Sequence, residues 1–246
     1  MSTAVMTRQD KEPSLRFKAR AAGFFWLMTI LGGIFAMSGD RLVIYSDAAA
    51  TAANILAHEA LYRWTFAANL FAGVCYLAAT MLVYSLLKPV NRDLSLLAAF
   101  FSLAACAIAG VSFVFRLAPL IFLGGSQYLS VFTAEQLQAL ALAFLRLNAQ
   151  GFYISHVFFG LHCFLVGYLI LRSAFLPRIV GVLMTCAGLG WLTMSWTNLL
   201  SPPLGRFLFP YIIAPGVIGE VSLTLWLLVK GVNVQRWKEQ AGAAGQ

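Results

Sequence analysis

Charge and histidine are scarce in this chain. Only 11% of its 246 residues are charged and three are histidine, whereas 61% are hydrophobic and the mean hydropathy is +0.81. A soluble domain cannot expose that much apolar surface to water, so a soluble fold is excluded. Long apolar runs at this density predict an all-α, polytopic membrane helical bundle.

The chain also lacks the short motifs that mark common catalytic and nucleotide-binding sites. It contains no GxSxG elbow, no HExxH pair, no P-loop and no GxGxxG turn. His156 and His162 are six residues apart, so they cannot form an i, i+4 metal pair. The four cysteines have no CxxC spacing and lie in apolar runs, which predicts small buried side chains. We therefore expect no metal and no cofactor, and a non-enzymatic role is favoured.

Six stretches are long and apolar enough to cross the hydrocarbon core of a bilayer, which takes about 20 helical residues. These predicted spans cover residues 21–37, 64–87, 94–123, 151–171, 179–196 and 210–230. The turns between them carry proline, glycine or charge, which breaks the apolar pattern.

Two further segments are amphipathic. Residues 48–63 follow the N-cap candidate Ser46-Asp47, and residues 134–150 follow Thr133, which forms a capping box with Gln136. Polar residues among alanine and leucine predict two interfacial helices lying on the outer membrane surface.

Positive charge is unevenly distributed between the predicted spans. Twelve of the seventeen Lys and Arg residues lie in the two tails and in the turns after the second and fourth spans. The positive-inside rule therefore places both termini in the cytoplasm, with six spans between them. The chain divides into a basic tail (1–20), a six-span domain (21–231) and a C-terminal tail (232–246). Lys and Arg at the ends of the spans would contact anionic lipid headgroups, which explains the net charge of +8. We therefore expect the lipid bilayer as a partner and no nucleic acid.

The sixth predicted span carries one acid, Glu220. A carboxylate at membrane depth is costly, so it is usually neutral, paired or turned toward a polar cavity. Glu220 lies ten residues before Lys230, and His162 lies ten residues before Arg172, which puts both roughly 15 Å above the inner boundary. Glu220 and His162 could share a proton, relay protons or bind a cationic solute, or they could lock two helices by a structural hydrogen bond.

Other polar residues in the spans have less specific interpretations. His156 shares a stripe of small residues with Gly160 and Gly167, and we expect it to form a hydrogen bond across a close helix contact. Asn69 is a further candidate for a helix-to-helix hydrogen bond. The six tryptophans are assigned to interface belts and packing.

Three arginines are predicted to gather at the outer end. Arg63, Arg116 and Arg146, together with Glu59, could bind an anionic headgroup or solute. The alternative is that they reach the membrane interface and form ion pairs there. Arg116 is the strongest of the three because apolar residues flank it on both sides.

Several motifs together resemble a known family. They are ARAAG in the first span, DAAATAANIL, LLKPVN, SLLAAFF, EQLQALAL, VFFGLH ending at His162, FLPRIVGVL, and GEVSLTLWLLVKGV containing Glu220. In order and spacing they resemble the bacterial multi-pass membrane proteins grouped as domain of unknown function 4386, over residues 17–232. The resemblance implies an integral membrane protein of the bacterial cytoplasmic (inner) membrane and adds no activity or cofactor.

Three functions stay open at this point. The favoured one is a transporter-like or sensory bundle that binds a small solute or lipid around Glu220 and His162. An intramembrane enzyme acting on lipid would use His162 or His156 as a base, although no nucleophile is recognisable. An accessory subunit of a membrane complex would have no site of its own. A homodimer could form through the small-residue faces of spans 94–123 and 179–196.

Overall fold

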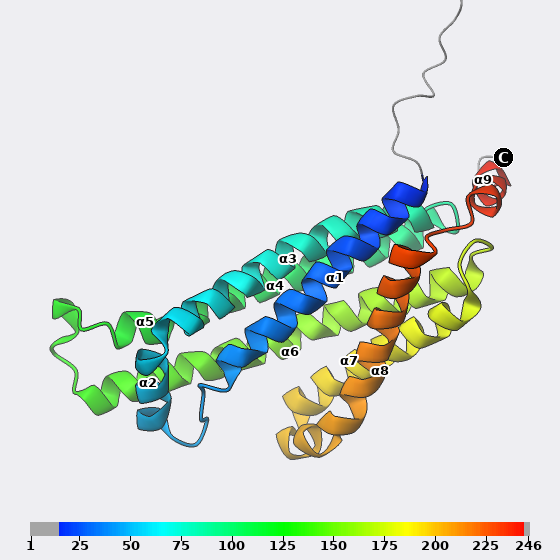
Figure 1. The fold of residues 1–246 in the computed structure, drawn as a ribbon. Coiled ribbons are helices and arrows are strands. Elements are labelled where there is room, and N and C mark those ends of the chain that lie inside the picture. The colour runs from blue at the N-terminus through cyan, green and yellow to red at the C-terminus, as the bar shows by residue number, and fades with distance from the viewer. Residues whose placement is uncertain (1–14, 244–246) are drawn as a thin grey trace, which may run out of the picture.

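The computed structural model describes residues 15–243, so the first 14 residues of the predicted basic tail and the last three residues of the chain lie outside it. Within this range the chain is helical and contains no strand (Figure 1). The helices are α1 (Leu15–Asp40), α2 (Ala48–Ala57), α3 (Glu59–Leu87), α4 (Arg92–Arg116), α5 (Ala118–Phe122), the 3-10 helix η1 (Gln127–Leu129), α6 (Ala134–Arg172), α7 (Arg178–Leu200), α8 (Pro202–Val229) and α9 (Val234–Ala243).

Six helical segments are long and apolar enough to cross a membrane. They are α1, α3, α4 continued by α5, α6, α7 and α8. This confirms the predicted all-α polytopic bundle with six membrane-spanning helices.

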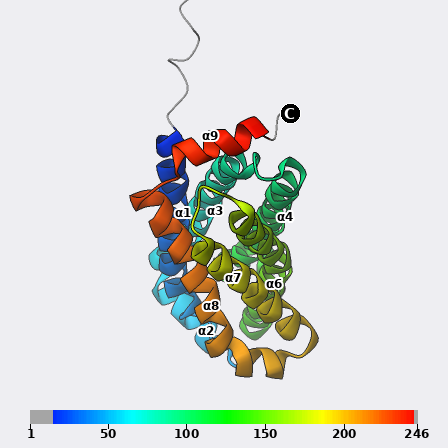
Figure 2. The ribbon, with the colours of Figure 1, turned by 90° about the vertical axis from the view of Figure 1, so that its right-hand side faces the viewer.

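The six long helices form a ring in the order of the sequence. Each packs against the next, and α8 closes the ring on α1 (Figure 2). The start of α1, the α3–α4 and α6–α7 turns and α9 lie at one end of the bundle (Figure 1). We call this the basic end, because Arg16, Lys88, Arg178, Lys230 and Lys238 lie there. The opposite end, with α2, α5 and η1, is called the far end.

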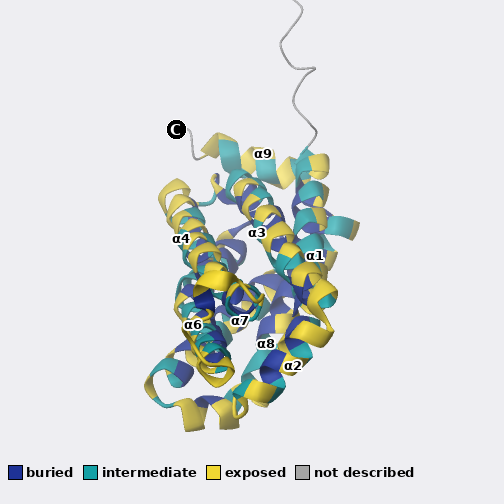
Figure 3. Cartoon of the chain, turned by 90° about the vertical axis from the view of Figure 1, so that its left-hand side faces the viewer, coloured by how far each residue is buried: buried dark blue, intermediate teal, exposed yellow. Residues whose placement is uncertain are grey.

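Side-chain burial distinguishes the inside of this ring from its outside. Exposed residues follow the outward faces of the helices, and buried residues face inward (Figure 3). Many of the exposed side chains are large and apolar, such as Ile34, Phe71, Met81, Val111 and Leu225. An apolar exterior of this extent is characteristic of a helical protein whose solvent is lipid.

The buried side chains form two cores. The main core lies inside the ring and includes Trp26, Tyr76 and Met184. A second, smaller core of Ile55, Tyr62 and Leu145 lies at the far end, where α2 packs on α6. The main core surrounds the position of Glu220.

The predicted helix starts are formed by side-chain caps. Asp47 accepts a hydrogen bond from the backbone N–H of Ala50 at 2.9 Å, which caps α2. At the start of α6, Thr133 and Gln136 form the predicted capping box. These caps satisfy N–H groups that have no partner inside the helix.

The far end differs from the prediction of two interfacial helices. α2 ends at Ala57, and residues 59–63 belong to α3. The separate surface helix predicted over 134–150 is wrong, because these residues are the first part of α6, which continues unbroken for 39 residues. A helix of that length is about 58 Å long, close to twice the hydrocarbon thickness, so part of α6 extends beyond the bilayer.

The C-terminal tail contains a helix that the sequence reading missed. α9 lies across the basic end of the ring (Figure 2). The indole N–H of Trp237 donates to the carbonyl of Leu86 at 2.8 Å, and Gln240 accepts from the N–H of Ala174 at 3.0 Å. These bonds attach the tail to the end of α3 and to the α6–α7 turn.

Candidate functional site

Two indole groups bind the carboxylate of Glu220 inside the bundle. Trp26 of α1 donates from Nε1 to Oε2 at 3.2 Å, and Trp191 of α7 donates from Nε1 to Oε1 at 2.9 Å. Glu220 itself is only 8% exposed. One carboxylate thus joins α1, α7 and α8, and we call this arrangement the indole clamp.

The clamp corrects the sequence-based assignment of the tryptophans. Trp26 is fully buried in the main core and Trp191 packs against it, so neither belongs to an interface belt. Both supply a donor to a group that would otherwise be a costly buried acceptor. The sequence contains no local pattern that distinguishes a tryptophan facing the core from one facing lipid.

Two glycines on α8 make room for the clamp. A side chain at Gly216 would meet the Trp191 ring at 2.6 Å, and one at Gly219 would meet the Leu183 carbonyl oxygen at 2.5 Å. Without side chains at these positions, α8 approaches α7 closely enough for Glu220 to reach the indole N–H.

His162 lies in the same core but is attached elsewhere. Its Nδ1 is 2.8 Å from the carbonyl oxygen of Ala98 on α4, and the residue is 1% exposed. A carbonyl oxygen can only accept, so Nδ1 carries a proton and, in the neutral ring, Nε2 carries the lone pair. That Nε2 is buried and has no hydrogen-bond partner among residues 15–243.

Glu220 and His162 both contact Trp26 in the main core, but no hydrogen bond joins them within residues 15–243. The Trp26 ring lies beside His162, with 6.1 Å between ring centroids, while its Nε1 binds Glu220. Trp26 therefore provides the contact between the acid and the imidazole.

A narrow crevice runs beside His162 between α3, α4 and α6. The crevice is too narrow to admit a water molecule, and Thr80 and Ser95 line it on the side of α3 and α4. Thr80 and Ser102 are joined by a hydroxyl–hydroxyl hydrogen bond of 2.7 Å. On α8, the buried hydroxyl of Thr224 has no hydrogen-bond partner in the described part of the chain, as is also true of His162 Nε2. Unpaired polar atoms in a core are unusual and mark positions where the contacts can change.

His156 and Asn69 do not form the predicted contacts between helices. His156 Nδ1 lies 2.9 Å from the carbonyl oxygen of Phe152, and Asn69 Nδ2 donates to the carbonyl of Thr65 at 3.2 Å, so both bonds stay within one helix. The His156 ring instead packs against Trp191, with 5.5 Å between centroids. Each indole of the clamp thus has one α6 histidine beside it.

The predicted outer arginine cluster is only partly formed. Arg116 forms an ion pair with Asp40 at 2.5 Å, and its guanidinium lies 5.5 Å from the centre of the Tyr62 ring. Arg146 donates to the backbone carbonyl of Tyr45 at 2.6 Å. Arg63 forms an ion pair with Glu59 at 2.7 Å on the surface of α3, so Arg63 and Glu59 are not part of the group around Arg116.

Tyr45 lies within the electrostatic influence of Asp40, Arg116 and Arg146 at the far end. Burial raises the pKa of the Tyr45 phenol, the charge of Asp40 raises this pKa further, and Arg116 and Arg146 lower it. The Nε and Nη2 atoms of Arg116 are buried and have no acceptor within the described range. Asp40, which the sequence analysis did not single out, is the partner of the buried arginine.

The cysteines are all free thiols, but not all are buried. Cys75 and Cys163 are buried, Cys106 is half-buried, and Cys186 is exposed, contrary to the prediction for the set. Within residues 15–243, no three His, Cys, Asp or Glu side chains are grouped as metal ligands would be.

Six apolar helices around a buried, hydrogen-bonded carboxylate define a polytopic helical membrane protein with a polar centre. The chain belongs to the family described as domain of unknown function DUF4386, whose model matches residues 21–231. It is also similar to an uncharacterized protein of Archaeoglobus fulgidus, with 28% identity over 153 residues, which is 61% of this chain and 72% of that protein. No solved structure matches the chain.

Proposed function

We propose that the protein is a transporter-like or sensory membrane bundle whose working centre is Glu220. The observation that carries this proposal is the indole clamp, because one titratable group there joins three helices. His162, with its unpaired Nε2 and its contact to Trp26, is the second member of the centre. A proton or a small cationic solute is the ligand that an acid and an imidazole would bind together.

The clamp depends on the protonation state of the acid. An ionised carboxylate only accepts, so both oxygens can receive an indole N–H. A protonated acid has a hydroxyl that must donate, so one of the two indole bonds weakens or rearranges. Binding or release of one proton at Glu220 therefore alters the contacts of α1 and α7 with α8. Such a change could alter the packing of these helices.

Tryptophan fluorescence of protein reconstituted in nanodiscs tests the proposal. We expect the emission of the wild type to change between acid and alkaline pH and the Glu220→Gln variant to lose that change. The exposed acid Glu59 gives a matched control, and Glu59→Gln should respond as the wild type does. The same pH response in wild type and Glu220→Gln would overturn the proposal.

Proteoliposomes separate the two forms of the proposal. A transporter-like bundle would let protons cross under an imposed pH gradient, as read by a pH-sensitive dye inside the vesicle, and Glu220→Gln would slow the flux. A sensory bundle would show the fluorescence change without flux.

We also propose that the bundle lies in the bacterial cytoplasmic membrane with its basic end toward the cytoplasm. The turns that hold Lys88, Arg92, Arg172 and Arg178 lie there beside α9, which supports this orientation.

A further inference from the structure

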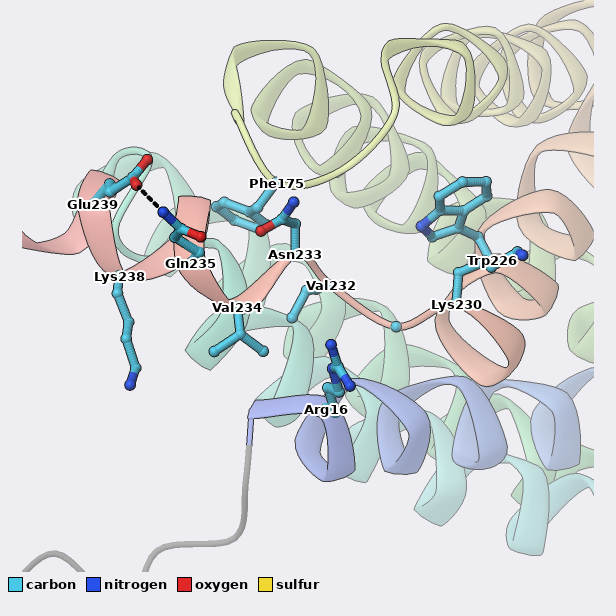
Figure 4. Close-up of a pocket in the computed structure, with 11 residues that line it drawn as sticks. Arg16, Phe175, Trp226, Lys230, Val232, Asn233, Val234, Gln235, Lys238 and Glu239 are labelled. Carbon is cyan, nitrogen blue, oxygen red and sulfur yellow. Dashed lines mark hydrogen bonds between the residues drawn. The ribbon is translucent and has the colours of Figure 1, made fainter.

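A basic groove lies at the basic end, where α1, α8 and α9 meet. Its residue Lys230 lies ten residues beyond Glu220 along the chain, so the groove is separate from the indole clamp. The volume of the groove is about 790 Å³. Three cationic side chains from three separate segments line it: Arg16 near the start of α1, Lys230 at the end of α8, and Lys238 in α9 (Figure 4).

Cations outnumber acids in the lining of the groove, with Arg16, Lys230 and Lys238 against Glu239. In the part of the chain that the structure describes, Arg16, Lys230 and Lys238 form no side-chain hydrogen bond and no ion pair. The carboxylate of Glu239 accepts from the neutral amide Nε2 of Gln235 at 3.1 Å and keeps its charge, which leaves the lining with two more cations than anions (three against one). Figure 4 shows Glu239 on the opposite side of α9 from Lys238. The groove therefore gathers positive charge that an external anion can neutralise.

The groove has fixed walls. Gly231 lies just beyond the end of α8, and its φ of +67° is the left-handed conformation that favours glycine. Its N–H donates to the carbonyl of Trp226 at 3.0 Å, which closes the last turn of the helix. The N–H of Asn233 then donates to the carbonyl of Phe175 at 3.2 Å. The hydrogen bond from Trp237 to the Leu86 carbonyl attaches α9 to the last turn of α3. These hydrogen bonds fix the position of α9, so the groove is a feature of the folded structure.

The lining of the groove is both cationic and apolar. Phe175, Trp226 and Val232 line it together with the three cations. Lys230 follows directly on a membrane-spanning helix, so the groove lies at the level of the lipid headgroups. A ligand that fits this lining carries a negative group next to an apolar one.

We propose that this groove binds the phosphate group of an anionic phospholipid. Arg16 and Lys230 bind the phosphate oxygens, as guanidinium and ammonium groups do, and Trp226 packs beside the glycerol and the start of the acyl chains. Lys238 adds charge from α9, so a bound lipid also holds α9 against α1. This site is separate from Glu220 and does not depend on the function proposed for that centre.

Native mass spectrometry of the full chain in phosphatidylcholine nanodiscs, titrated with phosphatidylglycerol, tests this site. The test variant is Arg16→Gln with Lys230→Gln. The control, Arg172→Gln with Arg178→Gln, removes the same charge from the same end but outside the groove. At about fivefold per cation, the test pair should weaken phosphatidylglycerol binding about 25-fold, and the control pair by far less.

Three results would overturn the proposal. Equal weakening by the two pairs would mean general attraction to an anionic surface. Displacement of phosphatidylglycerol by inorganic phosphate would mean that the groove takes a soluble phosphate. Undiminished binding to the test pair would mean that the lipid binds elsewhere. If the test pair does not reach the thermal midpoint of the wild type, Lys238→Gln alone replaces it, with an expected weakening of about fivefold.

Discussion

At the scale of single residues, the hydrogen bonds of Glu220 determine how the polar centre is built. Its two oxygens receive one indole N–H each, from helices far apart in the sequence. A buried acceptor without a donor would cost several kcal/mol, on the order of 2–7, so the tryptophans are as necessary to the site as the acid.

The Glu220→Gln variant should lose stability. An amide keeps one acceptor oxygen, while its NH2 group would face the second indole N–H, donor against donor. One buried indole then lacks an acceptor, and we expect the free energy of unfolding in detergent to fall by about 1–3 kcal/mol. The control Glu59→Gln breaks only the exposed pair with Arg63 and should change stability by less than about 1 kcal/mol. An unchanged or raised stability of Glu220→Gln would contradict the clamp.

Arg116 and Arg63 should differ although both form ion pairs at the far end. The side chain of Arg116 is 8% exposed and that of Arg63 is 60% exposed. Replacing Arg116 by Gln removes the pair with Asp40 and the contact with Tyr62, so we expect a loss of about 1–3 kcal/mol in unfolding free energy. Arg63→Gln should cost less than about 1 kcal/mol. Similar losses of unfolding free energy in the two variants, measured by the same denaturation assay, would contradict the expectation that the buried ion pair stabilises the fold more than the exposed one.

The sequence predicted the acid of the site but not its donors. Glu220 is identifiable because a charged group inside a 21-residue apolar stretch is rare and costly. Trp26 and Trp191 sit in apolar runs where they resemble ordinary packing residues. Their role depends on which face of the helix meets the centre of the ring, and that is fixed by the packing of α1 on α8 and of α7 on α8.

At the scale of helices, small residues set the closest contacts. Gly167 and Gly188 on facing helices bring α6 and α7 into backbone contact, with Thr185 and Phe164 as their neighbours. Gly181 also packs against α6 of the same chain. The small residues of the fifth span therefore pack against α6 within one chain. They no longer support a homodimer interface, and the homodimer stays a prediction.

Gly219→Ala tests the α7–α8 contact. The added methyl group would lie 2.5 Å from the Leu183 carbonyl oxygen, which is backbone and cannot turn away, so the helices must separate. We expect a loss of about 1–3 kcal/mol in unfolding free energy. Gly33 in α1 has open space around it, so Gly33→Ala should be neutral or gain up to about 1 kcal/mol. The opposite order of the two variants, in thermal denaturation, would show that this contact is not tight.

The extent of α6 shows why a helix boundary was mispredicted. The polar residues Gln138, Arg146 and Asn148 suggested a surface helix that ends before Gly151. Alanine and leucine between them favour the helical state, and no proline interrupts it. Asn148 is buried and donates to the carbonyl of Ser112, and Gly151 allows close contact with the same residue, so α4 holds α6 straight across the expected break.

At the scale of the whole molecule, the proposed orientation can be tested by cysteine labelling in cells. Single cysteines at Val131, beyond η1, and at Lys238, in α9, lie at opposite ends of the bundle and are exposed in the structure. In a background without native cysteines, an impermeant maleimide should label Val131→Cys from outside and Lys238→Cys only after lysis. The reverse pattern would invert the orientation, and labelling of both from outside would contradict the six-span topology.

The indole N–H signals of the protein labelled with ¹⁵N-tryptophan give the most direct test of a carboxylate held by two tryptophans inside a membrane bundle. Single Trp26→Phe and Trp191→Phe variants assign the two signals. We predict that both are protected from hydrogen exchange and that both move in Glu220→Gln, while the other four change little. Fast exchange of these two signals, or their indifference to Glu220→Gln, would contradict the account.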